Sequence, residues 1–539
     1  MRRLIIQAAV AAAAGAFCAA AFAAPPSGRV AHNVPPIAAK SHKIGPHSAT
    51  AVMNIAVGLK LRNTDELQQF LQQVQDPSSA QYHHFLTPEE FTERFGPTQA
   101  EADAVVRFLT SHGIHVKGVS PNRLLVRARG QTSVIEHAFG IAINDYRHGN
   151  RHFFAPSADP VLPAAIVGGV QSVIGLTDAA QLRPHHRVGA NKGKPPGHGG
   201  GGTTTPPGYS PNQIATAYHW PSVTDSANGA GATIAVATAR TFKSDDLTGF
   251  WSQYGLPNHS VQIIAVDGKS HRTEVETTLD IQRSGAMAPG AAILVYEGGD
   301  TYLTTFTDVY NQVVTDNQAD VMTTSWGLDE GDMPAATMQT DDAIFQQAAA
   351  QGISLFAAAG DNGSSDGTSD SNMADFPSSD PYVTAAGGTT LTLNSDNSIK
   401  SETVWSGAGG AESEVFAEPS WQTGTGVPQD GNRQSSDIAM DADPQTGYSV
   451  LSGGKWSVYG GTSFVAPELA GLFAVKVSQS GSRLGNVNPL IYADAASNYS
   501  TDFFDVTSGS NGAFSAGSFW DHPTGWGTPN ATNLLLHIQ

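Results

Sequence analysis

Residues 460–475 read Gly-Gly-Thr-Ser-Phe-Val-Ala-Pro-Glu-Leu-Ala-Gly-Leu-Phe-Ala-Val. Gly460 and Gly461 permit a tight turn, and the small and apolar residues after them predict a helix whose first turn carries Ser463. A hydroxyl there lies beside the unpaired N–H groups and the positive dipole end of the helix, which stabilise an oxyanion. Acyl transfer through a serine nucleophile needs this arrangement. The alternative is a Gly-Gly turn in which Thr462 or Ser463 caps a core helix.

The composition is typical of an exported globular protein. The chain has 539 residues, of which 14% are charged, with 57 Gly and 31 Pro. Residues 208–539 hold 36 acidic and 10 basic residues, a net charge of −26, whereas residues 1–207 have a net charge of +7. We interpret this division as a basic N-terminal part that docks on an acidic C-terminal part, although acidic surfaces also serve solubility alone. The acidic body disfavours nucleic acid and anionic membranes as partners.

The N-terminus predicts export. Residues 1–3 are Met-Arg-Arg, residues 4–22 are apolar and Ala-rich, and residues 21–23 are Ala-Phe-Ala, the three regions of a secretory signal peptide. We expect cleavage after Ala23 and a secreted monomer, extracellular or periplasmic. Cys18 is the single cysteine, so the mature protein should have neither disulfides nor a catalytic cysteine. No other stretch approaches the ~20 apolar residues that cross a bilayer.

Four further segments follow the signal peptide. Residues 24–47 are rich in Pro and Ser, and we expect them to be mobile. Residues 48–180 alternate strand and helix patterns, which predicts a small α+β domain, with a capping box at Thr87 and Glu90. Residues 181–207 are rich in Gly, Pro and Thr and predict a linker, where a maturation cut would fall because proteases need extended, accessible chain.

Residues 208–539 predict an α/β domain with a doubly wound, mainly parallel sheet. Its functional site is expected at the carboxyl ends of the strands. Apolar runs predict buried strands at 232–239, 261–266, 291–296, 320–326, 352–359 and 383–386. Crossover helices are expected at 245–254, 274–287, 302–317 and 338–351.

Carboxylates are the candidates for the base that activates Ser463. None of the five histidines after residue 208 lies in a catalytic sequence context, but Glu276 and Asp280 lie four residues apart on one expected helix. Their Cβ atoms would be about 5–6 Å apart, so the two groups would share a proton, which gives a base suited to acid. A solvated acidic helix edge has the same spacing, although Leu279 and other apolar neighbours favour a buried helix.

Asp361 is a third candidate carboxylate. It directly follows an apolar strand in residues 357–364, Ala-Ala-Ala-Gly-Asp-Asn-Gly-Ser. If protonated, its carboxyl could donate a hydrogen bond to an oxyanion at the carboxyl end of the sheet. The other interpretation is a plain Gly-Asp-Asn-Gly turn.

Four segments, taken in order, resemble those of the sedolisins, also called serine-carboxyl peptidases. Residues 85–97 are similar to the activation propeptide of the kumamolisin-type sedolisins, through Phe-Leu-Thr-Pro-Glu-Glu-Phe and Phe-Gly-Pro. The other three segments are Glu276-x-x-x-Asp280, Ala-Gly-Asp361 and Gly-Thr-Ser463-x-x-x-Pro467. The resemblance covers about residues 50–539 and implies a subtilisin-like α/β peptidase domain behind a small α+β propeptide.

The resemblance also implies an activity. A secreted endopeptidase, made as a zymogen, would act in acid on proteins or peptides, with its own propeptide as intramolecular inhibitor and chaperone. Ser463 would attack the scissile carbonyl, and Glu276 would take its proton. Asp280 would orient Glu276 and share its charge, and Asp361 would stabilise the oxyanion.

Two binding segments follow from the same resemblance. Residues Ser325, Trp326 and Gly327 are similar to the segment that pairs with extended substrate as an added strand, although an ordinary strand end with a packed Trp reads the same. One Ca²⁺ would bind near the C-terminus, where Phe519 departs from the family's usual Gly and the loop is short; a plain Gly/Asp turn is the alternative. Its ligands would be the carboxylates of Asp505 and Asp521 and the carbonyls of Val506, Gly517 and Phe519.

Two other functions stay open. A subtilisin-type serine peptidase active near neutral pH would need one of the five histidines beside Ser463. A catalytically inactive secreted binding protein could keep the same fold, although the four intact candidate residues argue against it. A pH profile separates the two enzymes, because a Glu base gives an acid optimum and a His base a neutral one.

Overall fold

The computed structural model describes residues 27–189, 206–225 and 227–538. The expected signal peptide, residues 1–23, and most of the expected linker, residues 190–205, lie outside the described residues. Within the described ranges, no helix is long and apolar enough to cross a membrane.

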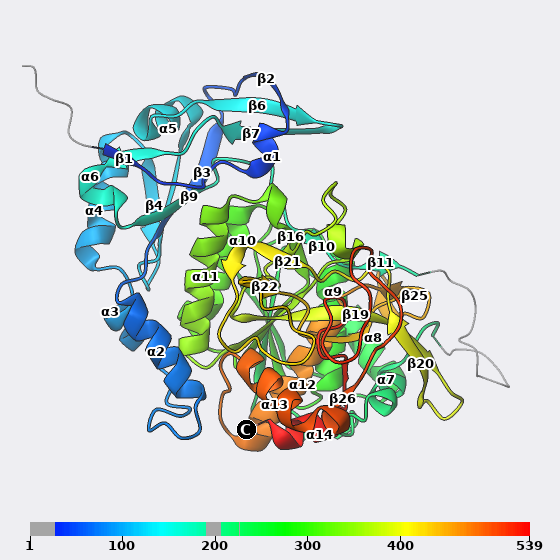
Figure 1. Cartoon of the computed structure of the whole chain (residues 1–539). Helices are drawn as coiled ribbons and strands as arrows, with labels where there is room; N and C mark the ends of the chain where they lie inside the picture. The colour runs from blue at the N-terminus through cyan, green and yellow to red at the C-terminus, as the bar shows by residue number, and fades with distance from the viewer. Residues whose placement is uncertain (1–26, 190–205, 226, 539) are drawn as a thin grey trace, which may run out of the picture.

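The N-terminal part is an α+β unit, coloured blue to cyan in Figure 1. Its antiparallel sheet has the strand order β4-β5-β3-β9, and apolar residues of α4 and α5 pack against one face of it. Thr87 and Glu90 form the expected capping box at the start of α3. The elements are β3 (Val52–Leu59), α2 (Thr64–Gln75), α3 (Pro88–Arg94), α4 (Gln99–Ser111), β4 (His115–Val119), β5 (Leu125–Gln131), α5 (Thr132–Phe139), α6 (Ala164–Val167) and β9 (Val170–Ile174).

Residues 27–46 differ from the expectation that residues 24–47 are mobile. They carry β1 (Ser27–Arg29), α1 (Pro36–Ala39) and β2 (His42–Pro46). Strand β1 pairs with β8 (Val161–Pro163), and β2 pairs with the hairpin of β6 (Ile143–His148) and β7 (Arg151–Pro156). The partners lie about a hundred residues away or more, so local composition did not indicate this pairing.

The C-terminal part is built on one large sheet with the order β13-β14-β12-β15-β17-β19-β20, and β23 lies beside β19. Every pair is parallel except β19 with β20. The expected doubly wound, mainly parallel sheet is therefore confirmed. Its strands are β12 (Thr233–Thr238), β13 (Val261–Ala265), β14 (Ala292–Glu297), β15 (Val321–Thr324), β17 (Ser354–Ala358), β19 (Val383–Leu393), β20 (Ile399–Val404) and β23 (Ile438–Asp441).

Helices cover both faces of this sheet. Alternate residues of β12 belong to different cores: Ile234 and Val236 pack in one, and Ala235 and Ala237 pack in the other. The first core contains α8 (Ser244–Tyr254), α9 (Val275–Met287) and α12 (Val465–Ser480), and the second contains α10 (Leu303–Asp316) and α11 (Ala335–Ala350). The remaining elements are α7 (Pro211–Ala217), β16 (Trp326–Asp329), η1 (Glu330–Asp332), η2 (Gly363–Ser365), β18 (Asp375–Phe376), β21 (Glu412–Ala417), β22 (Asn432–Gln434), β24 (Tyr448–Ser452), β25 (Lys455–Gly460), α13 (Asn488–Asp502), β26 (Phe503–Phe504), β27 (Thr528–Pro529) and α14 (Ala531–His537).

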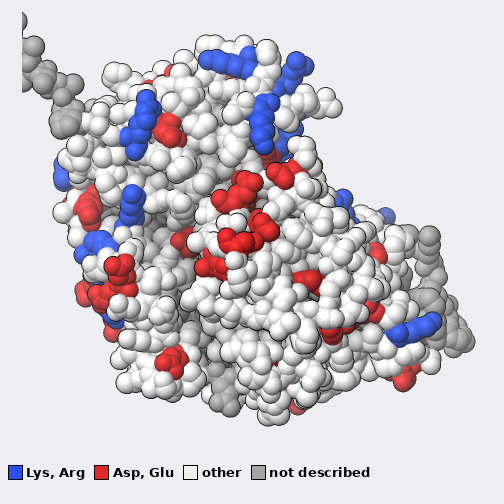
Figure 2. Space-filling model, viewed as in Figure 1, with Lys and Arg blue, Asp and Glu red and all other residues white. Residues whose placement is uncertain are grey.

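The N-terminal sheet packs through its second face against α10 and α11 (Figure 1). The contact is largely apolar, and at its centre the buried Asn122 Nδ2 donates to Asn311 Oδ1 and Gln347 Oε1, both at 2.7 Å. At its edges Arg127 lies 3.8 Å from Asp308, and a second pair joins Arg151 to Asp332. Figure 2 shows Lys and Arg side chains on the upper, N-terminal part and Asp and Glu side chains directly below it. The contact between the two parts is therefore largely apolar, and oppositely charged side chains lie along its border.

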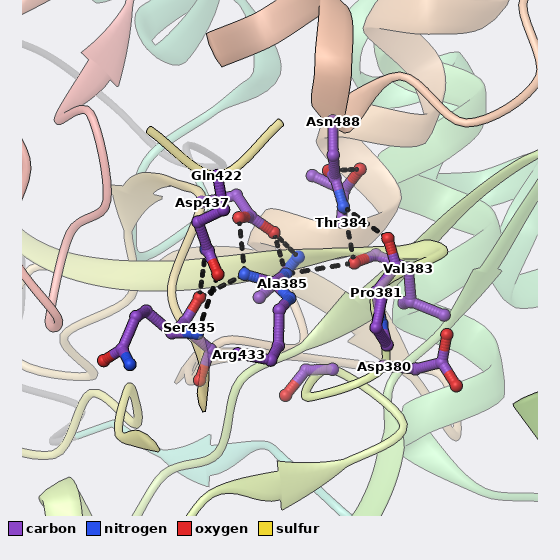
Figure 3. Close-up of polar contacts among 12 residues, drawn as sticks. Asp380, Pro381, Val383, Thr384, Ala385, Gln422, Arg433, Ser435, Asp437 and Asn488 are labelled. Atoms are coloured by element: carbon purple, nitrogen blue, oxygen red, sulfur yellow. Dashed lines mark hydrogen bonds and ion pairs between the residues drawn. The ribbon is translucent and has the colours of Figure 1, made fainter. Parts of the chain in front are cut away.

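A buried ion pair joins the later strands to the sheet (Figure 3). Arg433 and Asp437 are both buried, and the guanidinium donates to the two carboxylate oxygens at 2.6 and 3.0 Å. Asp437 also accepts from the Ala385 N–H at 2.8 Å and from the Tyr492 hydroxyl at 2.9 Å. The pair therefore connects β22, β19 and α13.

Removing one partner of this pair should cost more than removing both. We expect Asp437→Ala to lower the free energy of unfolding by about 3–5 kcal/mol, because it leaves the Arg433 cation buried and unpaired. The double variant Arg433→Met with Asp437→Leu should recover much of that loss. Denaturant unfolding of the precursor in a Ser463→Ala background measures both.

Glu66→Ala is the matched control, because it breaks the exposed pair with Arg94. Its effect should stay below about 1 kcal/mol. Equal losses for Asp437→Ala and Glu66→Ala would contradict the account.

Candidate active site

Ser463 lies in the turn between β25 and α12. The expectation that it belongs to the first helical turn is off by two residues, because α12 begins at Val465. Gly460 ends β25, and Gly461 has φ +119°, which favours glycine. Ser463 is fully buried, and its Oγ has no hydrogen-bond partner among the described residues. Its backbone N–H is not used by the helix and donates to a carbonyl of the linker segment, described below.

Glu276 and Asp280 lie on one face of α9, as expected, and both are fully buried. Asp280 Oδ1 accepts from Ser325 Oγ at 2.6 Å, and Glu276 Oε2 contacts His186 Nδ1. Burial and the charge of Glu276 raise the pKa of Asp280 well above its ordinary value. The helix edge is therefore a buried acid pair, not a solvated one.

Asp361 lies just beyond the carboxyl end of β17. Its Oδ1 accepts from the Thr462 N–H at 2.8 Å and from Thr462 Oγ1 at 3.0 Å, which fixes the carboxyl beside Ser463. Burial raises the pKa of Asp361 to about 7, although the charges of His185 and Arg187 and the Thr462 bonds lower it. Below that pH the group is protonated and can act as a hydrogen-bond donor.

Each of the four predicted catalytic residues has a buried polar atom with no hydrogen-bond partner among the described residues: Glu276 Oε1, Asp280 Oδ2, Asp361 Oδ2 and Ser463 Oγ. They come from α9, the turn after β17 and the turn before α12. Such atoms are available to a substrate or to water. Each of the four belongs to a residue that the sequence predicted for this site.

The end of the N-terminal part, residues 183–188, runs through the site as an extended strand, called the linker strand below. Strand β10 (Arg183–Pro184) pairs antiparallel with β16, and β11 (Arg187–Val188) pairs with β25. Between them the His185 N–H donates to the Ser325 carbonyl at 3.0 Å, and the His185 carbonyl accepts from the Ser463 N–H at 3.0 Å. A Cβ on Gly461 would lie within 2.5 Å of both Asp361 Oδ2 and the His185 carbonyl oxygen, so both oxygens border this glycine.

The side chain of the next residue, His186, hydrogen-bonds to the Glu276 carboxylate. Its ring packs edge-on against Tyr459, with the ring centroids 5.7 Å apart. Burial lowers the pKa of His186, but the charge and hydrogen bond of Glu276 outweigh burial, so the pKa is raised. Sequence reasoning missed His185 and His186 as site residues, and the run His-His-Arg at the end of the propeptide was the available signal.

The five histidines after residue 208 are not part of this site. None of them hydrogen-bonds to Ser463 in the described part of the chain. Among them, His259 packs against Trp251, and His522 stacks on Phe514 with centroids 3.8 Å apart. A histidine base for Ser463 therefore has no structural support.

Residues Ser325, Trp326 and Gly327 border the linker strand. Gly327 is paired with Arg183, and Trp326 with Pro184. The Trp326 ring itself is buried, and its Nε1 donates to Thr238 Oγ1 at 3.1 Å. The segment thus pairs with an extended strand and also packs its Trp in the core, so both interpretations of its sequence apply.

The two expected calcium-binding carboxylates lie in one loop region. Asp521 accepts from the Gly517 N–H at 3.0 Å, and Asp505 accepts from the Phe519 N–H at 3.2 Å. Burial, with the charge of Asp505, raises the pKa of Asp521 to about 6. The carbonyl oxygens of Val506, Gly517 and Phe519 accept no hydrogen bond from the described residues, so they are free to bind a cation. The residues present therefore fit an oxygen-ligated ion.

A separate group, Asp494, Asp502 and His537, also has metal-ligand chemistry, with ligand atoms within 4.8 Å of one another. His537 Nδ1 lies 2.6 Å from Asp502 Oδ2, which accounts for that contact as an ion pair. The sequence did not single out this group.

Comparisons with known proteins agree with the two parts of the chain. Residues 39–179 match the family described as Pro-kumamolisin, activation domain, and residues 258–490 match the Subtilase family. Sedolisin of Pseudomonas sp. (strain 101) is 32% identical, with 91% of this chain and 88% of that protein covered. Kumamolisin of Bacillus sp. (strain MN-32) is 30% identical, with 91% and 92% covered.

A solved structure supports the same conclusion. Pseudomonas sedolisin, described as a serine-carboxyl proteinase complexed with pseudo-iodotyrostatin, is similar with a TM-score of 0.56 at 32% identity, covering 62% of this chain and 99% of that chain. The subtilisin-like fold expected from the sequence is thus confirmed. The chain belongs to the sedolisin family of serine-carboxyl peptidases and carries an activation propeptide ahead of its peptidase domain.

Proposed function

We propose that this chain is a secreted endopeptidase precursor whose mature form cleaves proteins or peptides in acid with Ser463, Glu276, Asp280 and Asp361. One observation carries the proposal. The carbonyl of His185 accepts a hydrogen bond from the Ser463 N–H, and the four unpartnered atoms belong to the residues with the assigned roles. A peptide bond that meets a nucleophile, a base and an oxyanion donor is a substrate for acyl transfer.

In the proposed mechanism, Ser463 Oγ attacks the carbonyl carbon of the scissile bond, and its proton passes to Glu276. Before the attack Glu276 and Asp280 share one proton and one negative charge, since two adjacent buried carboxyls carry one negative charge at lower cost than two; the serine proton then neutralises the pair. The Ser463 N–H and the protonated Asp361 stabilise the oxyanion. Glu276 then gives the proton to the leaving amine, and water hydrolyses the acyl-enzyme by the same steps.

The acid range follows from two opposing requirements. Asp361 must be protonated to donate, so activity is lost as pH rises through about 7, the raised pKa of this group. The Glu276–Asp280 pair must keep one negative charge to accept the serine proton, so activity is also lost when both are protonated at low pH. The result is a bell-shaped profile on the acid side of neutrality.

Substitution of the base and of the oxyanion donor should slow turnover with the fold intact. We expect Glu276→Gln to lower kcat by about 10² to 10⁴-fold and Asp361→Ala by about 10² to 10³-fold. Steady-state kinetics of the mature variants on a denatured protein test this. Near-normal turnover in either variant would remove that residue from the mechanism.

Asp361→Asn is the matched control. Its amide keeps an acceptor for Thr462 and offers a donor that does not titrate. We expect it to retain more activity than Asp361→Ala and to lose the decline near pH 7. An unchanged alkaline decline in Asp361→Asn would assign that decline to another group.

We also propose that the maturation bond is His185–His186, and the support is the hydrogen bond between the His185 carbonyl and the Ser463 N–H. The propeptide acts as an inhibitor because its strand fills the cleft and His186 occupies the Glu276 carboxylate. At neutral pH the oppositely charged parts also favour docking. Acid removes the carboxylate charges at pH ~4–5 and with them the attraction, whereas the added histidine charges near pH ~6.5 would strengthen it.

Purified precursor should therefore process itself with a midpoint at pH ~4–5, and the new N-terminus should be His186. Mass spectrometry of the products against pH measures both. The Ser463→Ala precursor is the control and should stay intact. A first cut within residues 190–205, or equal processing of the control, would refute the assignment.

One Ca²⁺ is proposed for the C-terminal loop, held by the carboxylates of Asp505 and Asp521 and by three backbone carbonyls. Bound calcium would neutralise the two carboxylates and fix the loop, a structural role remote from the chemistry. The support is the pair of facing carboxylates and the free carbonyl oxygens of that loop.

A chelator at pH 7.5 should lower the melting temperature of the mature enzyme without changing its turnover, because a ligand bound only to the folded state stabilises it. At pH 4.5 the effect should shrink, since Asp521 becomes protonated below about 6. Asp521→Asn should abolish the chelator effect, whereas Asp502→Asn, in the separate acidic group, should keep it. A chelator effect that persists in Asp521→Asn and disappears in Asp502→Asn would assign the ion to the group of Asp494, Asp502 and His537.

A further inference from the structure

The His185 side chain lies in an acidic pocket. Its Nε2 is 3.0 Å from Asp375 Oδ2, and both side chains are almost completely buried. Neither Asp375 oxygen makes an aligned hydrogen bond among the described residues. Asp375 is held there by the antiparallel pairing of β18 with β16, in which Asp375 lies opposite Asp329.

Further carboxyl groups surround Asp375. Burial, with the charge of Asp375, raises the pKa of Asp366 to about 7, and burial raises that of Asp375 well above its ordinary value. Asp329 and Glu330 are close enough to act on Asp375, and both are buried. Arg183 lowers the pKa of Asp375 and His185 lowers that of Asp366, and both residues belong to the linker strand.

Two glycines give the pocket its shape. A Cβ on Gly327 would overlap the Asp375 carboxylate and approach His185 Nε2 to 2.7 Å. A Cβ on Gly360 would lie 3.2 Å from Asp366 Oδ1. Side chains at either position would therefore separate an incoming group from the carboxylates, and the glycines keep the floor of the pocket acidic and reachable.

Because the His185 carbonyl meets the Ser463 N–H, the side chain of the same residue defines the pocket on the acyl side of the scissile bond. We propose that this pocket selects substrates with a cationic side chain, His, Lys or Arg, immediately before the cleaved bond, and that Asp375 with Asp366 is its specificity determinant. The inference rests on the proposed function and adds the substrate class to it.

The physical reason is the loss of positive charge on maturation. Arg183 and His185 leave with the propeptide, and these are groups that lower the pKa values of Asp375 and Asp366 in the precursor. Burial then keeps both carboxyls protonated in acid. A cationic substrate side chain that replaces His185 favours the ionised form of Asp375, which gives its proton to water and pairs with the cation. An aromatic or aliphatic side chain makes no such pair and leaves the buried carboxyls without a partner.

The test uses mature enzyme at pH 5 and peptides that differ only in the residue before the scissile bond: His, Lys, Arg, Gln, Phe and Leu. We expect kcat/KM for the cationic peptides to exceed that for the Gln and Phe peptides at least tenfold. Asp375→Asn should remove most of that ratio. Asp370→Asn, an exposed carboxylate on the same segment, is the matched control and should keep the full ratio.

A second arm leaves the peptidase domain unchanged, so it does not depend on the folding of Asp375→Asn. In the precursor, His185→Lys should be cleaved at the 185–186 bond about as fast as the parent, and His185→Gln and His185→Phe at least tenfold more slowly. A ranking led by Phe or Leu, with normal turnover, would overturn the pocket assignment alone. No turnover of any peptide at any acid pH would overturn the proposed function together with this inference.

Discussion

The packing of α9 against α12 is the constraint on which the site depends. The proposed base carboxylates, Glu276 and Asp280, lie on one helix and the proposed nucleophile, Ser463, immediately precedes the other, so only the crossing of the helices brings the groups together. Gly471 permits that crossing, since a Cβ there would lie 2.7 Å from the Met287 Cβ. The buried Arg283 Nε donates to Glu468 Oε1 at 2.8 Å and ties the two helices further. Gly471 and the Arg283–Glu468 contact therefore set the distance between Glu276 and Ser463, although none of these three residues has a proposed catalytic role.

The parallel sheet supplies the other half of the site. Strands β15 and β17 end at the same edge, so the turns that follow them bring Ser325 and Asp361 beside the turn of Ser463. The linker strand then pairs with the edge of β16 and accepts from the Ser463 N–H, which α12 does not use. In the proposed function an extended substrate uses the same groups, so the propeptide must be displaced before the enzyme can act on another chain.

Burial of carboxyl groups is the electrostatic feature common to the whole cleft. It raises the pKa values of Asp280, Asp361, Asp366 and Asp375, each through loss of hydration. Groups of this kind stay protonated well above the pH at which free carboxyls ionise. They can donate hydrogen bonds or share protons where ordinary aspartates would repel one another. In the precursor Arg183, His185 and Arg187 lower the raised pKa values of Asp375, Asp366 and Asp361.

The sequence by itself determined what depends on neighbours along the chain. Helix periodicity located α9 with its pair Glu276 and Asp280, the capping box located α3, and the two glycines before Ser463 located the turn that precedes α12. Only the tertiary structure decided the ordered pairing of residues 27–46, the occupation of the cleft by His185 and His186, and the acidic pocket of Asp375. These features arise from strand register and burial between segments far apart in the chain. The spacing of residues along the chain does not indicate which distant backbone groups will form the hydrogen bonds or which distant segments will exclude water.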